Sequence, residues 1–335
     1  MEKSQRKVIC LTPVKNEAWI LETFLKCASL WADYVIIADQ NSDDESLKIA
    51  SRFEKVIIVN NDFGPYDEQQ RQQLLLNAAR SLPFPRLLIA LDADEFLTPN
   101  LDTSGEWQSV LNAPKGTIIK MPFAQIKPNM KHYWRTPDGV MGYMDDGYTH
   151  SGNVIHSPRV PIPANAPEIN LKEIFVMHYQ YVNWERMRSK HRWYQCWERI
   201  NNPERSSIDI FRQYHHMFGI RNKELQEVPA WWFDGYSKYG IDMRHINKEE
   251  CYWWDKEILR EMEEYGAKQF AKESIWDVKW ESIADQYRYE NTLKFKDPRC
   301  FLEKMVHTFL LKTQPYSQAI GVRLIDYILK RRFGW

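Results

Sequence analysis

The sequence predicts an α/β protein with a mostly parallel sheet flanked by helices, followed by a helical extension at the C-terminal end. Three observations support this prediction. In the first hundred residues, short apolar runs alternate with segments of helical periodicity. From about residue 105 to 180 the apolar runs are shorter and turn residues are frequent. After residue 183, helical spacing continues almost to the end of the chain.

Each expected element of the first hundred residues has its own signal. Apolar, β-branched runs predict buried strands, and apolar residues that recur every three or four positions predict helices. The expected strands are 7–12, 34–38, 55–59 and 86–91, and the expected helices are 17–30, 46–53 and 67–80. Because strands and helices alternate, right-handed crossovers should make these strands parallel. Later strand candidates are 117–121, 153–155 and 174–177, with a proline-rich loop between the last two.

Composition excludes several classes of protein. Forty-five Lys and Arg balance forty-five Asp and Glu, so no overall field attracts nucleic acid. The five cysteines are scattered without a C-x-x-C pair, which is typical of neither a zinc site nor a disulfide framework. The sequence contains no signal-peptide pattern and no apolar run long enough for a membrane span. We therefore expect a cytoplasmic protein with reduced thiols.

Polar side chains follow the expected parallel strands at the point where each strand ends. Asn16 and Glu17 follow the first strand, Asp39 follows the second, and Asp92 and Asp94 follow the fourth. In an open parallel sheet, ligands bind beyond the carboxyl ends of the strands. The sequence therefore predicts one functional site at this edge.

Asp92 and Asp94 give the most specific signal at this edge. Two carboxylates two residues apart on an extended segment can reach the same side, where they repel each other unless a cation lies between them. Hard oxygen ligands suit Mn²⁺ or Mg²⁺, and such a cation commonly also binds a substrate phosphate. The alternative interpretation is a solvated loop that caps a helix.

Two further residues are candidates for nucleotide contacts. Asp39 can accept hydrogen bonds from a base or a ribose hydroxyl, although the Asx- and Ser-rich segment 39–44 also fits a simple turn. Arg71 lies near the start of an expected helix, where it could approach a diphosphate or lie on a solvated face.

The segments TPVKNEAWILETFLKCASLWADYVIIADQNSDDES and LIALDADEFLTP resemble the family 2-like glycosyltransferases of GT-A fold. In that family a P-x-x-NE loop, a D-D-G-S-x-D turn and a later D-x-D occur in this order. The turn departs from the pattern, because Gln40 stands in place of a second aspartate and Asn41 in place of the glycine. The resemblance covers the first hundred residues well and the C-terminal part hardly at all.

The resemblance implies roles for the residues that match these motifs. Those implied to bind the nucleotide-sugar donor are Pro13, Asn16, Glu17, Asp39, Asp44 and Asp92, and those implied to hold the metal are Asp92 and Asp94. His178, after the apolar run IFVM, fits an additional metal or diphosphate ligand of this fold, or a structural residue. Arg192-Trp193 matches the end of the family's Q-x-x-R-W motif, with Ser189 in place of the glutamine, and Arg192 could offset the charge of the leaving group.

The expected function is a metal-dependent glycosyltransferase that moves a sugar from a UDP- or GDP-sugar to a glycan, lipid-linked or other hydroxyl acceptor, with inversion. Asp145 and Asp146, in the loop GYMDDGYTH, are the candidates for the general base, although an Asp-Gly turn explains them too. The catalytic domain is expected at 1–183, with a nucleotide-binding half at 1–104 and an acceptor half at 105–183. An aromatic-rich helical extension is expected at 184–335.

Two other functions remain open from the sequence. A sugar-phosphate nucleotidyltransferase would also use a nucleotide and Mg²⁺, but such enzymes usually begin with a glycine-rich phosphate loop, and TPVKNE has no glycine. A non-catalytic carbohydrate-binding or scaffold protein could use the aromatic C-terminal half. The paired carboxylates of Asp92 and Asp94 count against it.

The last segment, AIGVRLIDYILKRRFGW, combines an apolar stripe with basic residues. It fits a basic amphipathic helix on an anionic membrane, with Trp335 at the bilayer interface, or a terminal helix packed on its own domain. The first interpretation predicts peripheral contact with the inner membrane surface.

Overall fold

The structure, a computed structural model, describes residues 6–62, 64, 66–247, 249 and 251–335. The chain divides into two compact units. The first contains the described residues of Met1–Val182 and Gln226–Lys248, and the second contains those of Asn183–Leu225 and Glu249–Trp335. Residues 226–247, expected in the helical extension, therefore belong to the unit that contains the sheet. No helix among the described residues is long and apolar enough to cross a membrane.

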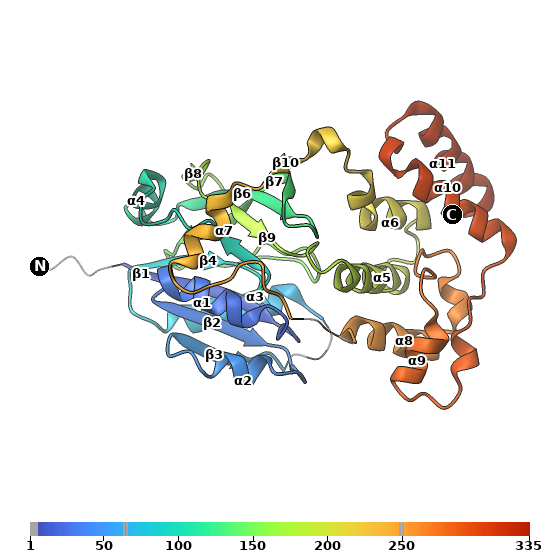
Figure 1. Cartoon of the computed structure of the whole chain (residues 1–335), viewed down its shortest axis with the longest axis horizontal. Helices are drawn as coiled ribbons and strands as arrows, with labels where there is room; N and C mark the ends of the chain where they lie inside the picture. The colour runs from blue at the N-terminus through green and yellow to red at the C-terminus, as the bar shows by residue number, and fades with distance from the viewer. Residues whose placement is uncertain (1–5, 63, 65, 248, 250) are drawn as a thin grey trace, which may run out of the picture. The chain divides into compact units, whose positions relative to one another are not determined.

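The described part of the first unit is built on a ten-stranded sheet (Figure 1). Its order is β3-β2-β1-β4-β7-β6-β9-β5, with β8 beside β6 and β10 beside β7. Strands β3, β2, β1 and β4 are mutually parallel, and β7 runs antiparallel to β4 and β6. The strands are β1 Lys7–Val14, β2 Tyr34–Asp39, β3 Val56–Asn60, β4 Arg86–Ala90, β5 Glu95–Leu97, β6 Ile118–Ile126, β7 His132–Met144, β8 Glu168–Asn170, β9 Val176–His178 and β10 Gln226–Glu227.

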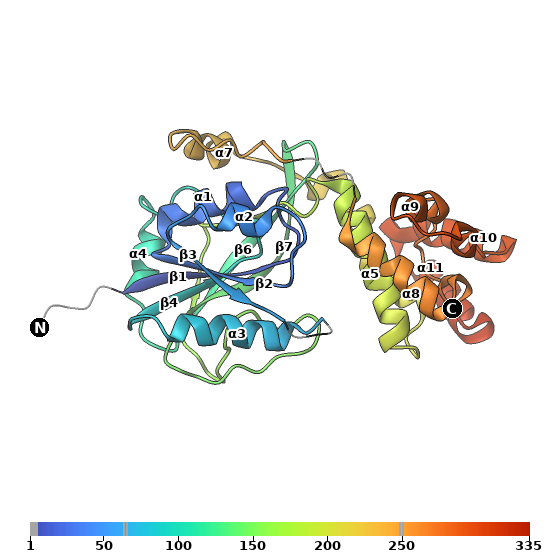
Figure 2. The same ribbon diagram turned by 90° about the horizontal axis from the view of Figure 1, so that it is seen from below.

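Helices cover both faces of the parallel strands (Figure 2). Helices α1 (Leu21–Trp31) and α2 (Ser46–Ala50) contribute to the core on one face, together with α4 (Gly105–Leu111) and α7 (Ala230–Ser237). Helix α3 (Glu68–Arg80) covers the other face. Alternate residues of β1 point to opposite faces, and both sets are apolar because both faces are covered.

The predicted mixed α/β class is confirmed, and all seven elements expected in the first hundred residues are present. Helix α1 begins at Leu21 instead of residue 17, and the backbone N–H groups of Glu17 and Ala18 bond to Ser46 and Asp44. The strand expected at 153–155 is wrong, since these residues form a loop.

Strand β7 is a thirteen-residue strand that the sequence pattern did not indicate. It contains Pro137, Asp138 and Gly139, a combination typical of a turn. Pairing with β6, the preceding strand of a hairpin, keeps it extended, with register shifts along the pair. Gly139 lies against Phe123, where a Cβ atom would come within 2.8 Å of the ring, so the absence of a side chain permits this close approach.

The second unit is helical, as expected after residue 183. Its main helices are α5 Trp184–Asn201, α6 Ser207–Tyr214, α8 Trp253–Tyr265, α9 Trp280–Gln286, α10 Phe301–Thr313 and α11 Ile320–Phe333. The Asn183 side chain caps α5 by accepting the N–H of Arg186 at 3.1 Å. The ring of Trp253 packs against those of Trp193 and Trp254 at centroid distances of 5.8 and 4.7 Å, as aromatic side chains do in a core.

Candidate functional site

The carboxyl ends of the parallel strands bring together three of the segments singled out in the sequence. Val14 of β1 lies opposite Asp39 of β2, and Asp39 lies opposite Asn60 of β3. On the other side of β1, Leu91 continues β4 and donates its N–H to Leu11 at 3.0 Å. The strand order reverses between β1 and β4, and ligands of open α/β sheets bind at such a switch point.

The first loop and the turn after β2 are bonded to each other. Asn16, at φ 54°, donates its N–H to Ser42 at 3.0 Å and its side-chain amide to Asp43 at 2.7 Å. Asp44 accepts the N–H of Ala18 at 2.9 Å. These contacts give Asn16 and Asp44 a role in shaping the loop.

Two other residues of the P-x-x-NE loop have equally local partners. Glu17 accepts the indole N–H of Trp19 at 2.7 Å, and its own N–H bonds to Ser46 at 2.8 Å. Pro13 lies within β1, opposite Ala38 of β2. Both residues therefore help to hold the loop and strand β1 in place. Their contacts with a nucleotide-sugar donor stay a prediction.

Asp39 is buried at the end of β2. Its Oδ2 accepts the N–H of Ser42 at 3.2 Å. Its Oδ1 is also buried, and no described residue offers it a hydrogen bond. Because a buried carboxylate oxygen without a donor is unfavourable, a ligand hydroxyl or base N–H at this position would be stabilising.

A short cross-strand pair brings the D-x-D segment to His178. Glu95 begins β5 directly after Asp94, and it lies opposite His178 of β9. The Nε2 atom of His178 lies 3.6 Å from Oδ1 of Asp94 and 3.8 Å from Oε1 of Glu95. The N–H of Asp92 donates to Oε2 of Glu95 at 3.0 Å, which closes the turn between β4 and β5.

Arg159 is a site residue that sequence reasoning missed. It comes from the proline-rich loop and donates to Oδ2 of Asp92 at 2.9 Å and to both carboxylate oxygens of Glu95. Burial by itself lowers the pKa of Arg159, but the charges of Asp92, Glu95 and Asp94 outweigh burial and raise it. No motif marks Arg159, because the loop reaches the site only through tertiary folding.

Glu95 was also missed, although it follows Asp94 directly. Its side chain is fully buried. Burial raises the pKa of Glu95, and Asp92 adds to the rise, whereas Arg159 and His178 oppose it. Three carboxyl groups and one guanidinium therefore lie close together. They belong to Asp92, Asp94, Glu95 and Arg159.

Arg71 lies in the first turn of α3 and interacts with Asp92. Its guanidinium carbon is 5.5 Å from the centre of the Tyr66 ring. Burial lowers the pKa of Arg71, but Tyr66, Glu68 and Asp92 outweigh burial and raise it. Glu68 accepts the N–H of Ser157 at 2.8 Å, so the start of α3 is joined to the loop that carries Arg159.

The carboxylates of Asp92 and Asp94 suit a hard divalent cation such as Mn²⁺ or Mg²⁺, whereas the imidazole of His178 is a ligand type that softer metals prefer. The arrangement of these three side chains is less suited to a metal. Among the residues that the structure describes, no group of three or more His, Cys, Asp or Glu side chains is arranged to hold a metal. Asp92 is turned toward Arg159, which supplies the positive charge. A cation at this site would have to share Asp92 with the guanidinium or displace it.

Asp145 and Asp146 lie at the other edge of the sheet. Met144 pairs with Leu87 at the start of β4, and the N–H of Asp145 donates to Arg86 at 3.1 Å. Strand β4 has five residues, so its first and last Cα atoms are separated by roughly 13 Å. This position lies away from the D-x-D segment.

Neither carboxylate has the surroundings of a base. Arg80 and Arg86 each contact one oxygen of Asp145, at 3.0 and 2.9 Å. Burial raises the pKa of Asp145, but the two guanidinium groups outweigh burial and hold it below its ordinary value. Asp146 accepts hydrogen bonds from the phenol of Tyr143 and from the N–H of Tyr148. These contacts fit the alternative interpretation of this segment as a turn. The base role therefore stays a prediction that this geometry does not favour.

Arg192 lies in the second unit and has partners there. It donates to both oxygens of Asp277, at 2.7 and 3.2 Å, and lies 3.7 Å from Asp255. Burial raises the pKa of Asp277, but Arg192 and Arg188 outweigh burial and lower it to about 2. The charge of Arg192 is therefore neutralised within its own unit.

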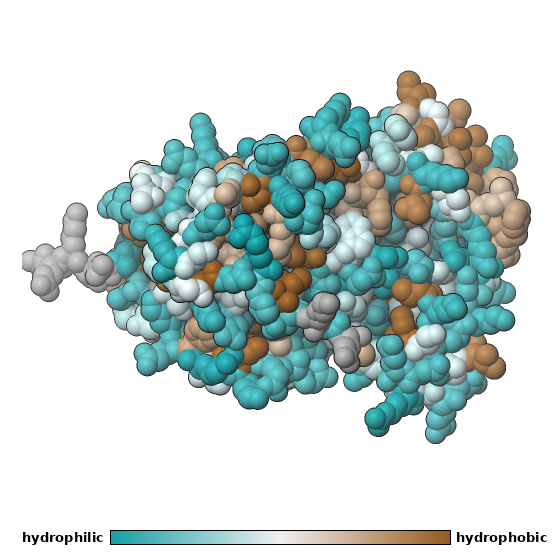
Figure 3. Space-filling model, in the orientation of Figure 1, coloured by the Kyte–Doolittle hydropathy of each residue, from teal (hydrophilic) through white to brown (hydrophobic). Residues whose placement is uncertain are grey.

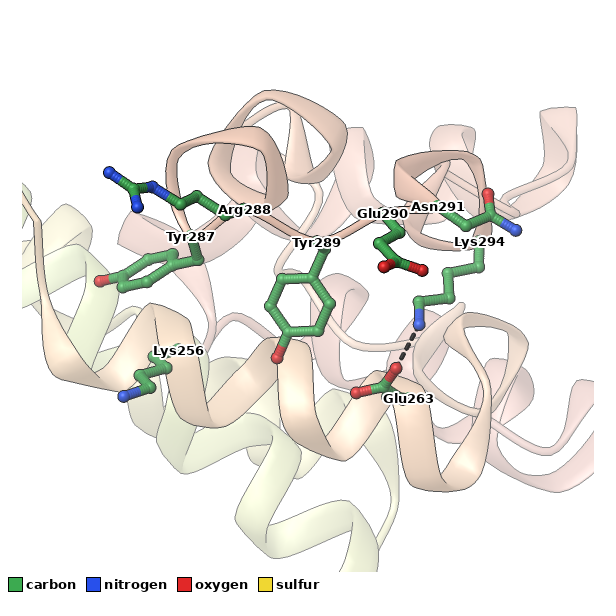
Figure 4. Close-up of a pocket in the computed structure, with 8 residues that line it drawn as sticks. All are labelled: Lys256, Glu263, Tyr287, Arg288, Tyr289, Glu290, Asn291 and Lys294. Atoms are coloured by element: carbon green, nitrogen blue, oxygen red, sulfur yellow. Dashed lines mark hydrogen bonds and ion pairs between the residues drawn. The ribbon is translucent and has the colours of Figure 1, made fainter.

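The second unit also contains a polar cavity of about 550 Å³ (Figure 4). Lys294 is paired with Glu263 in its wall. None of the residues singled out in the sequence lines it. The lining residues are Lys256, Glu263, Tyr287, Arg288, Tyr289, Glu290, Asn291 and Lys294.

No protein-family model matches the chain. Among solved structures, glucosyl-3-phosphoglycerate synthase from Mycobacterium tuberculosis, in complex with Mn²⁺, uridine diphosphate and glucosyl-3-phosphoglycerate, is similar at 16% identity and a TM-score of 0.28. The match covers 36% of this chain and 45% of that chain. The chain therefore spans less than half the length of this solved protein.

Two other solved structures show similarity of the same order. 4-diphosphocytidyl-2C-methyl-D-erythritol synthase matches at 19% identity and a TM-score of 0.26, over 35% of this chain and 60% of that one. HddC from Yersinia pseudotuberculosis matches at 10% identity and a TM-score of 0.30, over 52% and 93%. Similarities this low identify no family. The chain itself shows an α/β sheet whose carboxyl edge gathers Asp39, Arg71, the Asp92–Asp94 segment, Arg159 and His178.

Proposed function

We propose that this protein is a metal-dependent glycosyltransferase that uses a nucleotide-sugar donor. The supporting observation is the convergence of Asp39, Arg71, Asp92 and Asp94 at the carboxyl edge around the switch point between β1 and β4. In the proposal, residues 1–183 form a GT-A catalytic domain together with residues 226–247, which lie in the same compact unit, and the other residues of 184–335 form a helical extension.

The nucleoside would be held at the end of β2. Oδ1 of Asp39 is the group that needs a donor, and a ribose hydroxyl or a base N–H supplies one. The loop of Asn16 and the turn of Asp44 keep this end of the strand in place through the contacts between them. Arg71, at the start of α3, would contact the diphosphate, to which a helix N-terminus and a guanidinium both contribute favourable charge.

The donor diphosphate and a divalent cation, Mn²⁺ or Mg²⁺, would lie at the D-x-D segment. The residues assigned to the cation are Asp92 and Asp94, whose carboxylate oxygens match its preferences, and His178, whose Nε2 lies 3.6 Å from Asp94. A cation held there would supply positive charge to the departing nucleoside diphosphate. Arg159, which pairs with Asp92, would turn toward the diphosphate when a cation takes that carboxylate, since a guanidinium binds phosphate in a bidentate manner.

The acceptor and its base are left open in this proposal. An inverting transfer needs a group that takes the proton of the acceptor hydroxyl. Asp145 is engaged by two arginines at the opposite edge of the sheet. We therefore assign the base to neither Asp145 nor Asp146.

A thermal-shift screen of UDP, GDP, CDP and ADP with Mn²⁺ tests the proposal. A ligand that binds only the native state raises the melting temperature by mass action. We expect one or two of these nucleotides to raise it in wild type and to lose most of the effect in Asp39→Ala. If no nucleotide shifts the wild-type protein with or without Mn²⁺, the proposal is wrong.

Product analysis then distinguishes the alternatives. A glycosyltransferase releases a nucleoside diphosphate from the bound nucleotide-sugar. A sugar-phosphate nucleotidyltransferase instead releases pyrophosphate from a nucleoside triphosphate. A scaffold protein does neither.

A further inference from the structure

The C-terminal helix α11 is attached to its unit by its polar side. Asp326 is buried, and its two oxygens accept from the guanidinium of Arg212 on α6, each at 3.1 Å. Lys330, one turn later, donates to Asp209 of α6 at 2.5 Å. The inward side of α11 therefore carries two charged side chains, and Leu329 packs beside them against the apolar cluster of α6 and α10.

The opposite side of α11 is apolar and lies in solvent. Ile320 is 87% exposed, Leu324 and Tyr327 are each 58% exposed, and Ile328 is 43% exposed. Residues 320, 324 and 328 are four positions apart, so they form one ridge along the helix. A helix of a water-soluble domain normally turns such a ridge toward its core. In α11 the orientation is reversed.

This orientation is fixed by several contacts. Arg212 also donates to the carbonyl of Leu310 at 2.9 Å and to Gln314 at 3.1 Å, so it joins α11 to the end of α10. At the C-terminal end, Lys272 donates to the carbonyl of Gly334 at 2.7 Å. Trp335, for which the sequence left open a position at a bilayer interface, is buried in a cluster with α6 and α10. Rotating the helix to bury its ridge would break all of these contacts.

Helix α10 adds apolar side chains to the same part of the unit. Phe301 is 80% exposed and Met305 is 53% exposed, on one row of α10. Figure 3 shows hydrophobic residues gathered over the end of the helical unit that α10 and α11 form. Large exposed apolar patches mark sites of interaction with proteins or membranes.

The charges around the ridge are of one sign. Arg323, Arg331 and Arg332 are exposed. By helical spacing, Arg323 and Arg332 flank opposite sides of the ridge, and Arg331 lies within it. Among the described residues, no carboxylate forms an ion pair with any of these three arginines. The single acidic residue of α11, Asp326, is turned inward.

We propose that the exposed ridge of α11, together with Phe301 and Met305 of α10, is a surface that binds the face of an anionic phospholipid bilayer. Apolar side chains at the level of the headgroups, flanked by arginines, are the arrangement of an interfacial helix. A symmetric contact between two copies would place the same arginines against each other, since such an interface joins identical patches. The inference does not depend on the proposed chemistry.

Co-sedimentation of the full-length chain with vesicles tests the proposal. We expect binding to vesicles of phosphatidylcholine with 30% phosphatidylglycerol at low salt, weaker binding at physiological salt, and little binding to pure phosphatidylcholine. Replacing Arg323, Arg331 and Arg332 together by Gln should lower the partition coefficient on the order of 100-fold at low salt. The double variant Leu324→Glu, Ile328→Glu should lower it at least about 10-fold.

A matched control is Leu30→Glu, which places the same charge on an exposed leucine of α1 in the other unit and should bind like wild type. Melting temperatures of all variants show whether the fold survives. The proposal is overturned if the wild-type chain does not pellet with anionic vesicles at low salt, or if Leu324→Glu, Ile328→Glu binds as well as Leu30→Glu. It is also overturned if analytical ultracentrifugation shows a dimer that this double variant dissociates and no vesicle binding is found.

Discussion

Replacing Arg159 by Met removes the positive charge that Asp92 and Glu95 share. Glu95 is fully buried, and Arg159 is one-quarter exposed. Removing one partner of a fully buried ion pair costs about 3–5 kcal/mol, and exposure reduces this value. We therefore expect Arg159→Met to lower the free energy of unfolding by roughly 2–3 kcal/mol in the absence of metal. For a unit of this size that is a fall of roughly 4–12 °C in melting temperature.

The same variant should respond more strongly to a divalent cation. In wild type a cation has to compete with Arg159 for Asp92, whereas in the variant the carboxylates of Asp92 and Asp94 repel each other without compensation. Mn²⁺ at a hundred times its dissociation constant stabilises a protein by about 2.7 kcal/mol, which is similar to the expected loss. The assay is a thermal-unfolding series over Mn²⁺ concentrations. Both the melting temperature and the apparent dissociation constant are read.

The control for this experiment is Arg52→Met, which removes an exposed ion pair with Glu22 and should cost less than about 1 kcal/mol. It should respond to Mn²⁺ as wild type does. An Arg159→Met protein that melts like wild type would show that the cluster does not need its guanidinium. Equal Mn²⁺ shifts in wild type and Arg159→Met would refute the idea that Arg159 and the cation share Asp92.

Three further predictions concern single side chains. Asp92→Ala or Asp94→Ala should reduce sugar transfer about 1,000-fold with an intact circular dichroism spectrum, because each removes a group assigned to the cation. Full activity in either variant would contradict the assignment of these residues to a metal. Asp39→Ala should raise KM about 10- to 100-fold and leave kcat nearly unchanged, since a uniform binding contact is lost, and an unchanged nucleotide affinity would contradict this role. Burial raises the pKa of Glu261 to about 8, against about 4.5 when unfolded, so the folded state holds an extra proton and stability falls as pH rises from about 4.5 to 8. Glu261→Gln should therefore be more stable than wild type at pH 8 by up to a few kcal/mol in urea unfolding. If the variant gained the same free energy of unfolding at pH 5 as at pH 8, the raised pKa of Glu261 would not be the cause.

The sequence by itself determined the α/β class and the edge of the sheet where the polar segments gather. Apolar, β-branched runs and helical spacing are local patterns, so β1, β2, β3 and β4 could be placed within a few residues. The parallel arrangement followed from the alternation of strands and helices. Once the strands were parallel, Asp39 and the Asp92–Asp94 segment had to lie at the same edge.

Other features depended on contacts that the local sequence pattern does not reveal. Strand β7 contains a turn-like Pro-Asp-Gly, and its pairing with β6 overrode that local preference. Strand β7 also placed Asp145 beside the amino end of β4. Because β7 runs antiparallel to β4, its carboxyl end lies next to the start of β4. Arg159 reached Asp92 from sixty-seven residues away, through a loop with no periodic pattern.

The tertiary structure also decided which side of α11 faces outward. The sequence shows that the helix has an apolar side and a charged side, and in most proteins the apolar side is buried. Here Arg212 and Asp209 of α6 engage Asp326 and Lys330, so the charged side is held inward. Helical periodicity gives the angle between two faces of a helix, and only the contacts made by its neighbours determine which face meets the solvent.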